Sequence, residues 1–219
     1  MPRLSKIAAM ERRQELITVA AQLFLKQGYE NTTVNQIIGS LNLAKGTYYY
    51  HFRSKEDILI AVSDKLISDT REKLVAIHKQ NDKDVLWRIR EILSIFHDDF
   101  YRNRTIWKLV YHDNNVAMHK QVTKIGGKRF TPLLTDVIRE GMEKDLVQVP
   151  HAQETAQALI SIFDIFSRQL CSARGHDKRV RIFETLRYLI GQILGKDCIP
   201  EFRSSNEFVR VRHSKEKGF

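Results

Sequence analysis

The most informative part of the chain runs from Thr32 to Leu59 and reads TTVNQIIGSLNLAKGTYYYHFRSKEDIL. Thr33 and Gln36 have the spacing of a capping box, in which each side chain satisfies a backbone amide at the start of a helix. The apolar residues that follow recur at the spacing of a helix with one buried face. The stretch therefore predicts a short helix that begins after Thr33.

Asn42 follows this helix at a position where a tight turn needs a residue that accepts left-handed backbone. A second short helix is expected from Lys45 to His51. Ser54 then has the position of an N-cap, which predicts the start of a longer helix. A short helix, a turn and a second short helix, in this order, are typical of a helix-turn-helix module.

The second short helix can be oriented from its periodicity. At about 100° per residue, Tyr48 and Phe52 fall on one side, where we expect them to pack against the preceding helices. The opposite side then carries Gly46, Thr47 and Tyr50. Gly46 lets a backbone approach closely, and Thr47 offers a hydroxyl and a methyl group to the edges of bases. This helix is therefore a candidate to read a nucleic acid.

Other polar residues of this region have two interpretations each. Lys45 and Tyr49 share one flank of the helix and could contact phosphates, while His51 lies on the other flank. Thr33 is either only a cap or a cap that also presents its amide to a phosphate. Lys55 is either a solvated lysine or part of an anion site at the start of the longer helix.

The region also contains the motifs Thr32-Thr33-Val34, Leu43 to Tyr49, His51-Phe52 and Ser54-Lys55-Glu56. In these motifs the chain resembles the TetR family of transcriptional regulators over about its first 55 residues. The resemblance implies that the second short helix enters the major groove of DNA. It implies DNA contacts from Lys45, Thr47, Tyr49, Tyr50 and His51, with Thr33, Asn35 and Lys55 beside them.

The sequence departs from the family pattern at three positions. Asn42 replaces the usual glycine of the turn, a change that the left-handed tolerance of asparagine accommodates. Ala44 replaces a common serine or threonine cap, which removes one hydroxyl that could face a phosphate. Ile38 replaces a frequent alanine and fills more space between the helices.

The charge of the chain favours an anionic partner. Its 219 residues include 36 lysines and arginines against 26 acidic residues, a formal net charge of +10. A surplus of this size is common in proteins that bind nucleic acids, although composition alone does not separate DNA from RNA or a membrane surface.

Cys171 and Cys198 form no ligand spacing and no disulfide framework. With no apolar run long enough for a signal peptide or a membrane span, we expect a cytoplasmic protein.

The remaining sequence predicts an all-α fold. A three-helix helix-turn-helix domain is expected over residues 1–55, a helical ligand-binding and dimerisation bundle over 56–195, and a basic, mobile tail over 196–219. Gly126-Gly127 and Thr131-Pro132 predict an interruption in the helical stretch from Asn115 to Lys144. The helices outside the helix-turn-helix are expected near residues 10–27, 84–101, 106–112, 115–144, 152–173 and 178–194.

The last two helices carry wide apolar stripes. Such stripes either fill the core of one chain or also pair two chains, and the TetR resemblance implies pairing as a homodimer. Two-fold pairing also suits a DNA reader, because two half-sites about 34 Å apart need two recognition helices. The expected interface residues are Leu159, Ile162, Leu170, Phe183, Leu186, Ile190 and Ile193.

The middle helices are rich in aromatic residues with polar residues interleaved, among them His97, His112, Asn114 and Asn115. This composition indicates either an ordinary core or an apolar pocket for a small-molecule inducer. We expect no metal site, because His97-Asp98-Asp99 and His112-Asp113 do not set several ligands on one face. The expected pocket residues are Phe96, Phe100, Trp107, Tyr111, Phe130, Phe163 and Phe166.

These observations favour a TetR-like regulator, a repressor released from a palindromic operator by an inducer. The alternative is an architectural DNA-binding protein that needs no ligand. The sequence shows no nucleophile–base pair, no phosphate-binding glycine loop and no cofactor motif, so we expect neither an enzyme nor a cofactor.

Overall fold

The computed structural model describes residues 2–111 and 116–201, and within them the chain forms helices and no strands. The expected all-α fold is confirmed. Four helices build the N-terminal part and the connection to the rest of the molecule: α1 (Pro2–Gln27), α2 (Val34–Gly39), α3 (Lys45–His51) and α4 (Lys55–His78).

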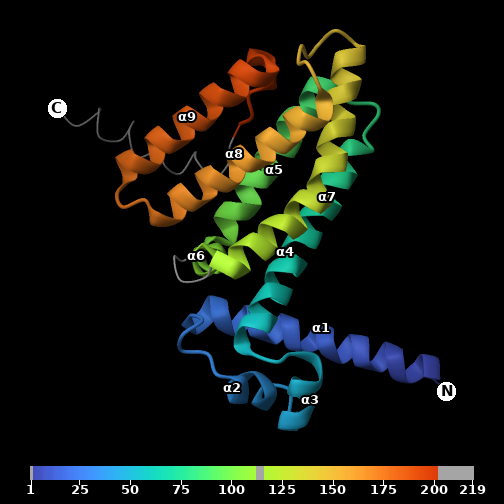
Figure 1. Cartoon of the computed structure of the whole chain (residues 1–219), viewed down its shortest axis with the longest axis vertical. Helices are drawn as coiled ribbons and strands as arrows, with labels where there is room; N and C mark the ends of the chain where they lie inside the picture. The colour runs from blue at the N-terminus through green and yellow to red at the C-terminus, as the bar shows by residue number, and fades with distance from the viewer. Residues whose placement is uncertain (1, 112–115, 202–219) are drawn as a thin grey trace.

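The C-terminal bundle stands above the N-terminal helices, and α4 runs from one group into the other (Figure 1). Helix α7 packs extensively against both α4 and α8, and α9 lies beside α8. The bundle consists of α5 (Val85–Arg102), α6 (Arg104–Val110), α7 (Val116–Glu143), α8 (Ala152–Ser172), α9 (His176–Leu194) and a short 3-10 helix, η2 (Lys196–Cys198).

Helix α1 begins earlier than the sequence predicts, at Pro2 rather than near Met10. Residues 2–9 contain no glycine. Their one proline stands at the first helical position, where its fixed φ suits a helix and its missing amide would have no partner within the helix. Leucine, lysine and alanine in this stretch are good helix formers. Nothing in these residues stops the helix from extending toward the N-terminus.

Helix α7 is continuous, so the predicted interruption near Gly126-Gly127 and Pro132 is wrong. A proline inside a helix removes one backbone hydrogen bond and crowds the preceding turn. Here the apolar face of α7 is buried on both sides of Pro132, at Val122 and at Leu134. Packing against α4, α5 and α8 therefore outweighs the local preference for a break.

The core of the helix-turn-helix extends beyond the expected boundary at residue 55. It includes Phe24 and Tyr48, and also Ile106 and Val110 of α6 and Val122 of α7. Helix α6 makes contacts with α1 as well as with α8. The N-terminal helices therefore share one hydrophobic cluster with the lower end of the bundle.

Part of the predicted dimer surface lies in the interior of the single chain. Leu159 and Ile190 are 0% exposed, and Phe183 and Leu186 are also buried. These four residues are a correction to the expected interface: α8 and α9 pack with the bundle through them, which leaves nothing for a partner chain to touch. Ile162, Leu170 and Ile193 are half-buried.

The segment after α9 is packed up to Glu201, although the sequence predicts a mobile tail from residue 196. Cys198 is 0% exposed, and Ile199 lies against Gly191, where an added Cβ would come within 2.8 Å of Ile199 Cδ1. Ser94 and Arg187 donate hydrogen bonds to carbonyls of this segment, at Glu201 and Pro200. The rest of the predicted tail, residues 202–219, lies outside the described residues. No helix among the described residues is long and apolar enough to cross a membrane.

Candidate nucleic-acid interface and ligand cavity

The two sides of α3 differ strongly in exposure. Tyr48 is 0% exposed and Phe52 is 3% exposed, so both lie in the core beneath the helix. Tyr50 on the opposite side is 77% exposed, and Gly46 is exposed as well. Thr47 is half-buried between these two sides. The predicted orientation of the helix, with Tyr48 and Phe52 inward, is confirmed.

Tyr48 ties α3 to the start of α4. Its hydroxyl donates a hydrogen bond to the carbonyl of Ser54 at 3.0 Å, and its ring centroid lies 5.7 Å from that of Phe52. Ser54 caps α4, because its Oγ accepts from the amide of Asp57 at 3.2 Å. Burial raises the pKa of Tyr48 above its ordinary value, so the hydroxyl stays a donor at neutral pH. These bonds fix which side of α3 faces outward.

The start of α2 and the turn after it follow the predicted pattern. Thr33 Oγ1 accepts from the amide of Gln36 at 3.2 Å, and the amide of Thr33 donates to Gln36 Oε1 at 2.8 Å, which completes the capping box. Asn42 adopts φ of 51°, in the left-handed region. Asn35 is exposed on α2. The turn therefore places α2 and α3 as a helix-turn-helix.

Basic and aromatic side chains line the flanks of α3. Lys45 Nζ lies 5.9 Å from the ring centroid of Tyr49, which is 49% exposed. On the other flank, the guanidinium of Arg13 lies 5.1 Å from the Phe52 ring centroid. Burial and the charge of Arg13 lower the pKa of half-buried His51. The sequence interpretation did not include Arg13, whose only signal was its place in a basic N-terminal stretch.

Lys55 has a structural contact that the sequence interpretation did not predict. Its Nζ donates a hydrogen bond to the carbonyl of Tyr29 at 2.9 Å and lies 4.0 Å from the centroid of the Tyr29 ring. Tyr29 in turn donates to Glu56 at 3.1 Å. The Lys55 ammonium therefore holds the loop after α1 against the start of α4.

A second candidate site is a cavity of about 110 Å³ in the lower part of the bundle, walled by α4, α5, α6, α7 and α8. Its walls are mainly apolar and aromatic. The edge-on rings of Phe96 and Phe130 lie 4.8 Å apart, and the ring of Phe163 lies 5.6 Å from Phe96. Six of the seven predicted pocket residues line this cavity: Phe96, Phe100, Trp107, Tyr111, Phe130 and Phe163.

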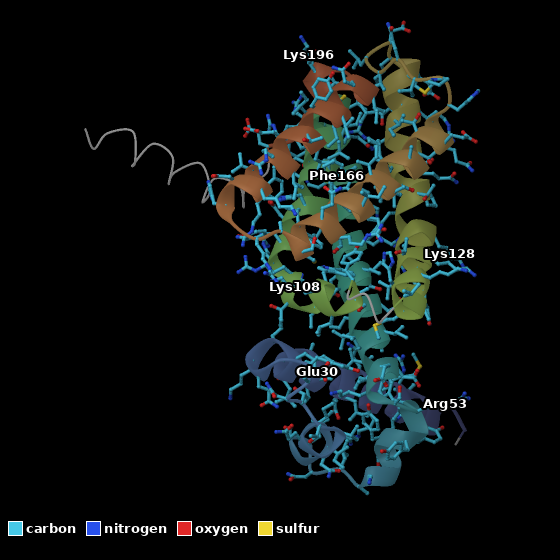
Figure 2. All side chains as sticks on the ribbon, turned by 60° about the vertical axis from the view of Figure 1, so that its left-hand side comes forward. Glu30, Arg53, Lys108, Lys128, Phe166 and Lys196 are labelled. Carbon is cyan, nitrogen blue, oxygen red and sulfur yellow. The ribbon has the colours of Figure 1, made fainter. Side chains whose placement is uncertain are left out.

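Phe166 is the exception and a correction to the predicted pocket. It is 8% exposed and belongs to the core cluster that contains Phe183 and Leu186. Figure 2 shows it well inside the C-terminal bundle. Phe166 lies three positions after Phe163, close enough in helical phase to share a broad stripe, but it is buried in the core cluster and does not line the cavity.

The polar wall of the cavity centres on Asp164 of α8. Its Oδ1 accepts from the Tyr111 hydroxyl at 3.0 Å and from Thr123 Oγ1 at 3.2 Å. His119 Nε2 lies 3.3 Å from both carboxylate oxygens. Burial, followed by the charge of Asp164, raises the pKa of Tyr111 well above its ordinary value. Tyr111 therefore remains protonated and donates to the carboxylate.

Asp99 is the other carboxylate at this cavity, and it already has charged and neutral partners. Lys73 Nζ lies 2.7 Å from Asp99 Oδ1, and Thr70 donates to Oδ2 at 3.0 Å. The sequence interpretation did not include Asp164, His119 and Thr123, and it considered Asp99 only as a metal ligand. Asp164 had a recognisable signal, since it is the one charged residue in the apolar run LISIFDIF of residues 159–166.

His97, which the sequence singled out in this region, does not line the cavity. His97 is 2% exposed, its Nδ1 lies 3.1 Å from Asp98 Oδ1, and its ring packs edge-on against Phe183. Burial lowers the pKa of His97. His112, Asn114 and Asn115 lie outside the described residues.

The connected helices α2 and α3, with one buried side on α3, define a helix-turn-helix protein. Residues 16–62 match the family described as bacterial regulatory proteins, tetR family. In this stretch, which runs from α1 into α4, the chain is similar to the TetR family.

Two relatives and a solved structure are similar to longer parts of the chain. The chain is 28% identical over 115 residues to the transcriptional regulator AcrR of Shigella flexneri, covering 51% of this chain and 54% of AcrR. It is 24% identical over 200 residues to the transcriptional activator FasR of Mycolicibacterium smegmatis, covering 89% and 87%. A TetR-family regulator from Pectobacterium atrosepticum has the same fold, with a TM-score of 0.69, 19% identity, and coverage of 86% and 96%. The match spans about half of AcrR.

Proposed function

We propose that this protein regulates transcription by binding duplex DNA, with α3 in the major groove. The observation that carries the proposal is the one-sided burial of α3, which turns Tyr50 and Gly46 outward while Tyr48 stays in the core. A helix of this size fits the major groove, where its outward residues meet base edges. The formal charge of +10 supports an anionic partner.

The proposed contacts divide by chemistry. Thr47 and the backbone at Gly46 approach base edges, and Lys45 and Tyr49 contact phosphates. Lys55 is proposed beside them at the start of α4, where its ammonium also donates to the Tyr29 carbonyl. Four further residues on or beside the exposed face complete the proposed interface: Thr33, Asn35, Tyr50 and His51.

We infer that the protein acts as a homodimer through α8 and α9. Ile165 is 44% exposed and Tyr188 is 62% exposed, large side chains that α8 and α9 leave uncovered in the single chain. Together with half-buried Ile162, Leu170 and Ile193, they offer an apolar surface on two adjacent helices. A two-fold pair built on it would carry two recognition helices, as a palindromic site requires.

The cavity provides a route by which a small molecule could change DNA affinity. Trp107 and Val110 of α6 line the cavity and also pack on the core of the helix-turn-helix. A ligand that prefers one arrangement of α6 and α4 would favour one spacing of the two recognition helices. Coupling of this kind is typically worth about 1–3 kcal/mol. We propose that the protein is a repressor that an inducer releases in this way.

The alternative is an architectural DNA-binding protein that ignores both sequence and ligand. The two functions differ in a selection experiment with the full chain and a library of random DNA duplexes. The regulator enriches a palindrome with half-site centres about 34 Å apart. An architectural protein enriches no sequence, although its affinity still falls steeply with salt. Failure to retain any duplex at low salt would contradict both.

A further inference from the structure

We propose that the cavity binds an aromatic organic cation, and that Asp164 is the group that recognises its charge. The inference rests on the proposed function in one respect, which is that the cavity is the site where the inducer binds. It specifies the charge and aromatic character of the ligand, which the sequence alone predicts only as apolar.

The first step of the argument is the charge of Asp164. The groups that bond to its carboxylate are the hydroxyls of Tyr111 and Thr123 and the imidazole of His119. The hydroxyls are neutral donors, and histidine is a charged partner only when protonated. Among the residues that the structure describes, no lysine or arginine lies within 4.0 Å of this carboxylate. When His119 is neutral, these three groups orient the carboxylate of Asp164 without cancelling its charge.

The second step is the contrast with Asp99 in the same cavity. Asp99 receives the ammonium of Lys73 at 2.7 Å and the hydroxyl of Thr70 at 3.0 Å, so its charge is matched within the protein. The side chain of Asp164 is 19% exposed, and a carboxylate can accept about four hydrogen bonds. Among the described residues, Asp164 has no lysine or arginine partner, and its Oδ2 is bonded to His119 alone, which leaves this oxygen able to accept from a bound molecule.

The third step is the aromatic wall around this charge. The six rings of Phe96, Phe100, Trp107, Tyr111, Phe130 and Phe163 line the cavity. Aromatic faces attract cations, and the attraction grows where water is excluded. The indole N–H of Trp107 is buried without a hydrogen-bond partner among the described groups, and a flat ligand could offer it an acceptor or a π face. A carboxylate surrounded by aromatic rings is a chemical match for a flat, positively charged ligand.

The fourth step is access to Asp164. An outer groove between α7 and α8 shares Thr123, Gly127, Ile160 and Asp164 with the cavity. Gly127 adds no side chain there, and a Cβ at this position would meet nothing within 4 Å. A molecule that enters between these helices meets Asp164 at the point where groove and cavity join.

The test compares a cation with a neutral molecule of nearly the same shape. Calorimetric titration at pH 8 measures the affinity of the full-length protein for N-methyl-4-phenylpyridinium and for 4-phenylpyridine, which is neutral at that pH. We expect the cation to bind about tenfold more tightly. In D164N this preference disappears while the neutral compound keeps its affinity. D69N, which removes an exposed carboxylate paired with Lys65, leaves both affinities unchanged.

Equal affinities of the two compounds for the wild-type protein would overturn the proposal, as would a preference that survives in D164N. So would the failure of both N-methyl-4-phenylpyridinium and N-methylquinolinium to bind. DNA binding by the same preparation, measured separately, distinguishes the two proposals. If the protein binds DNA but no cation, only the ligand assignment fails. If it binds the cation selectively but no DNA, the proposed regulatory function fails.

Discussion

The surface of α3 and the cavity in the bundle are built in different ways. The α3 surface comes from seven consecutive residues, and one buried tyrosine with one backbone acceptor sets its orientation. The cavity takes its walls from five helices, and its central carboxylate bonds to Tyr111 directly after α6 and to Thr123 of α7. A site on one short helix follows from helical phase, whereas a site between helices depends on how the whole bundle packs.

The largest expected effect concerns Tyr48. Y48A removes a fully buried ring and its hydrogen bond to Ser54, so we expect the free energy of unfolding to fall by about 3–5 kcal/mol. The matched control is Y50A on the opposite side of α3, which should change stability by less than about 0.5 kcal/mol. Urea denaturation followed by circular dichroism measures both. Similar losses in the two variants would mean that α3 does not have one buried and one exposed side.

Phe163 and Phe166 allow a cavity position and a core position to be compared on the same helix, α8. F166A should cost about 3 kcal/mol of stability, because it opens a hole in the packed core. F163A should cost less, since this ring borders a cavity that is already present, and it should weaken ligand binding instead. Thermal unfolding with and without N-methyl-4-phenylpyridinium separates the two effects. The assignment of Phe166 to the core would be wrong if F166A were the milder change.

The smallest expected effect lies in the turn of the helix-turn-helix. Asn42 adopts φ of 51°, a conformation that costs alanine about 1 kcal/mol or more. N42A should therefore lower stability by about 1 kcal/mol, whereas N42G should be neutral or slightly stabilising. Denaturant midpoints of the two variants test this order, and a more stable N42A would contradict it.

Local signals predicted the helix-turn-helix well. The Thr33 capping box, the left-handed Asn42 and the inward Tyr48 each depend on interactions within a few residues, and all are present in the structure. Caps and turns of this kind are encoded by the residues that form them.

Predictions that depended on neighbouring helices were less accurate. Pro132 indicated a break, but burial of α7 on both sides of it keeps the helix continuous. Phe166 and Phe163 belong to one apolar stripe, and only the packing of the bundle places Phe166 in the core and Phe163 at the cavity. Leu159 and Ile190 have the spacing of an interface, yet they are buried in their own chain. Periodicity identifies an apolar face without naming what covers it.

The central claim is that the outward side of α3 contacts DNA, and two single variants test it most directly. Fluorescence anisotropy measures the affinity of T47A and Y49A for the selected palindrome and for single-base variants of it. We predict that Y49A weakens binding to all these duplexes alike, and that T47A changes the preference among them by about 1–3 kcal/mol. If both variants bind every duplex as the wild-type protein does, the assignment of α3 as the DNA-reading helix is wrong.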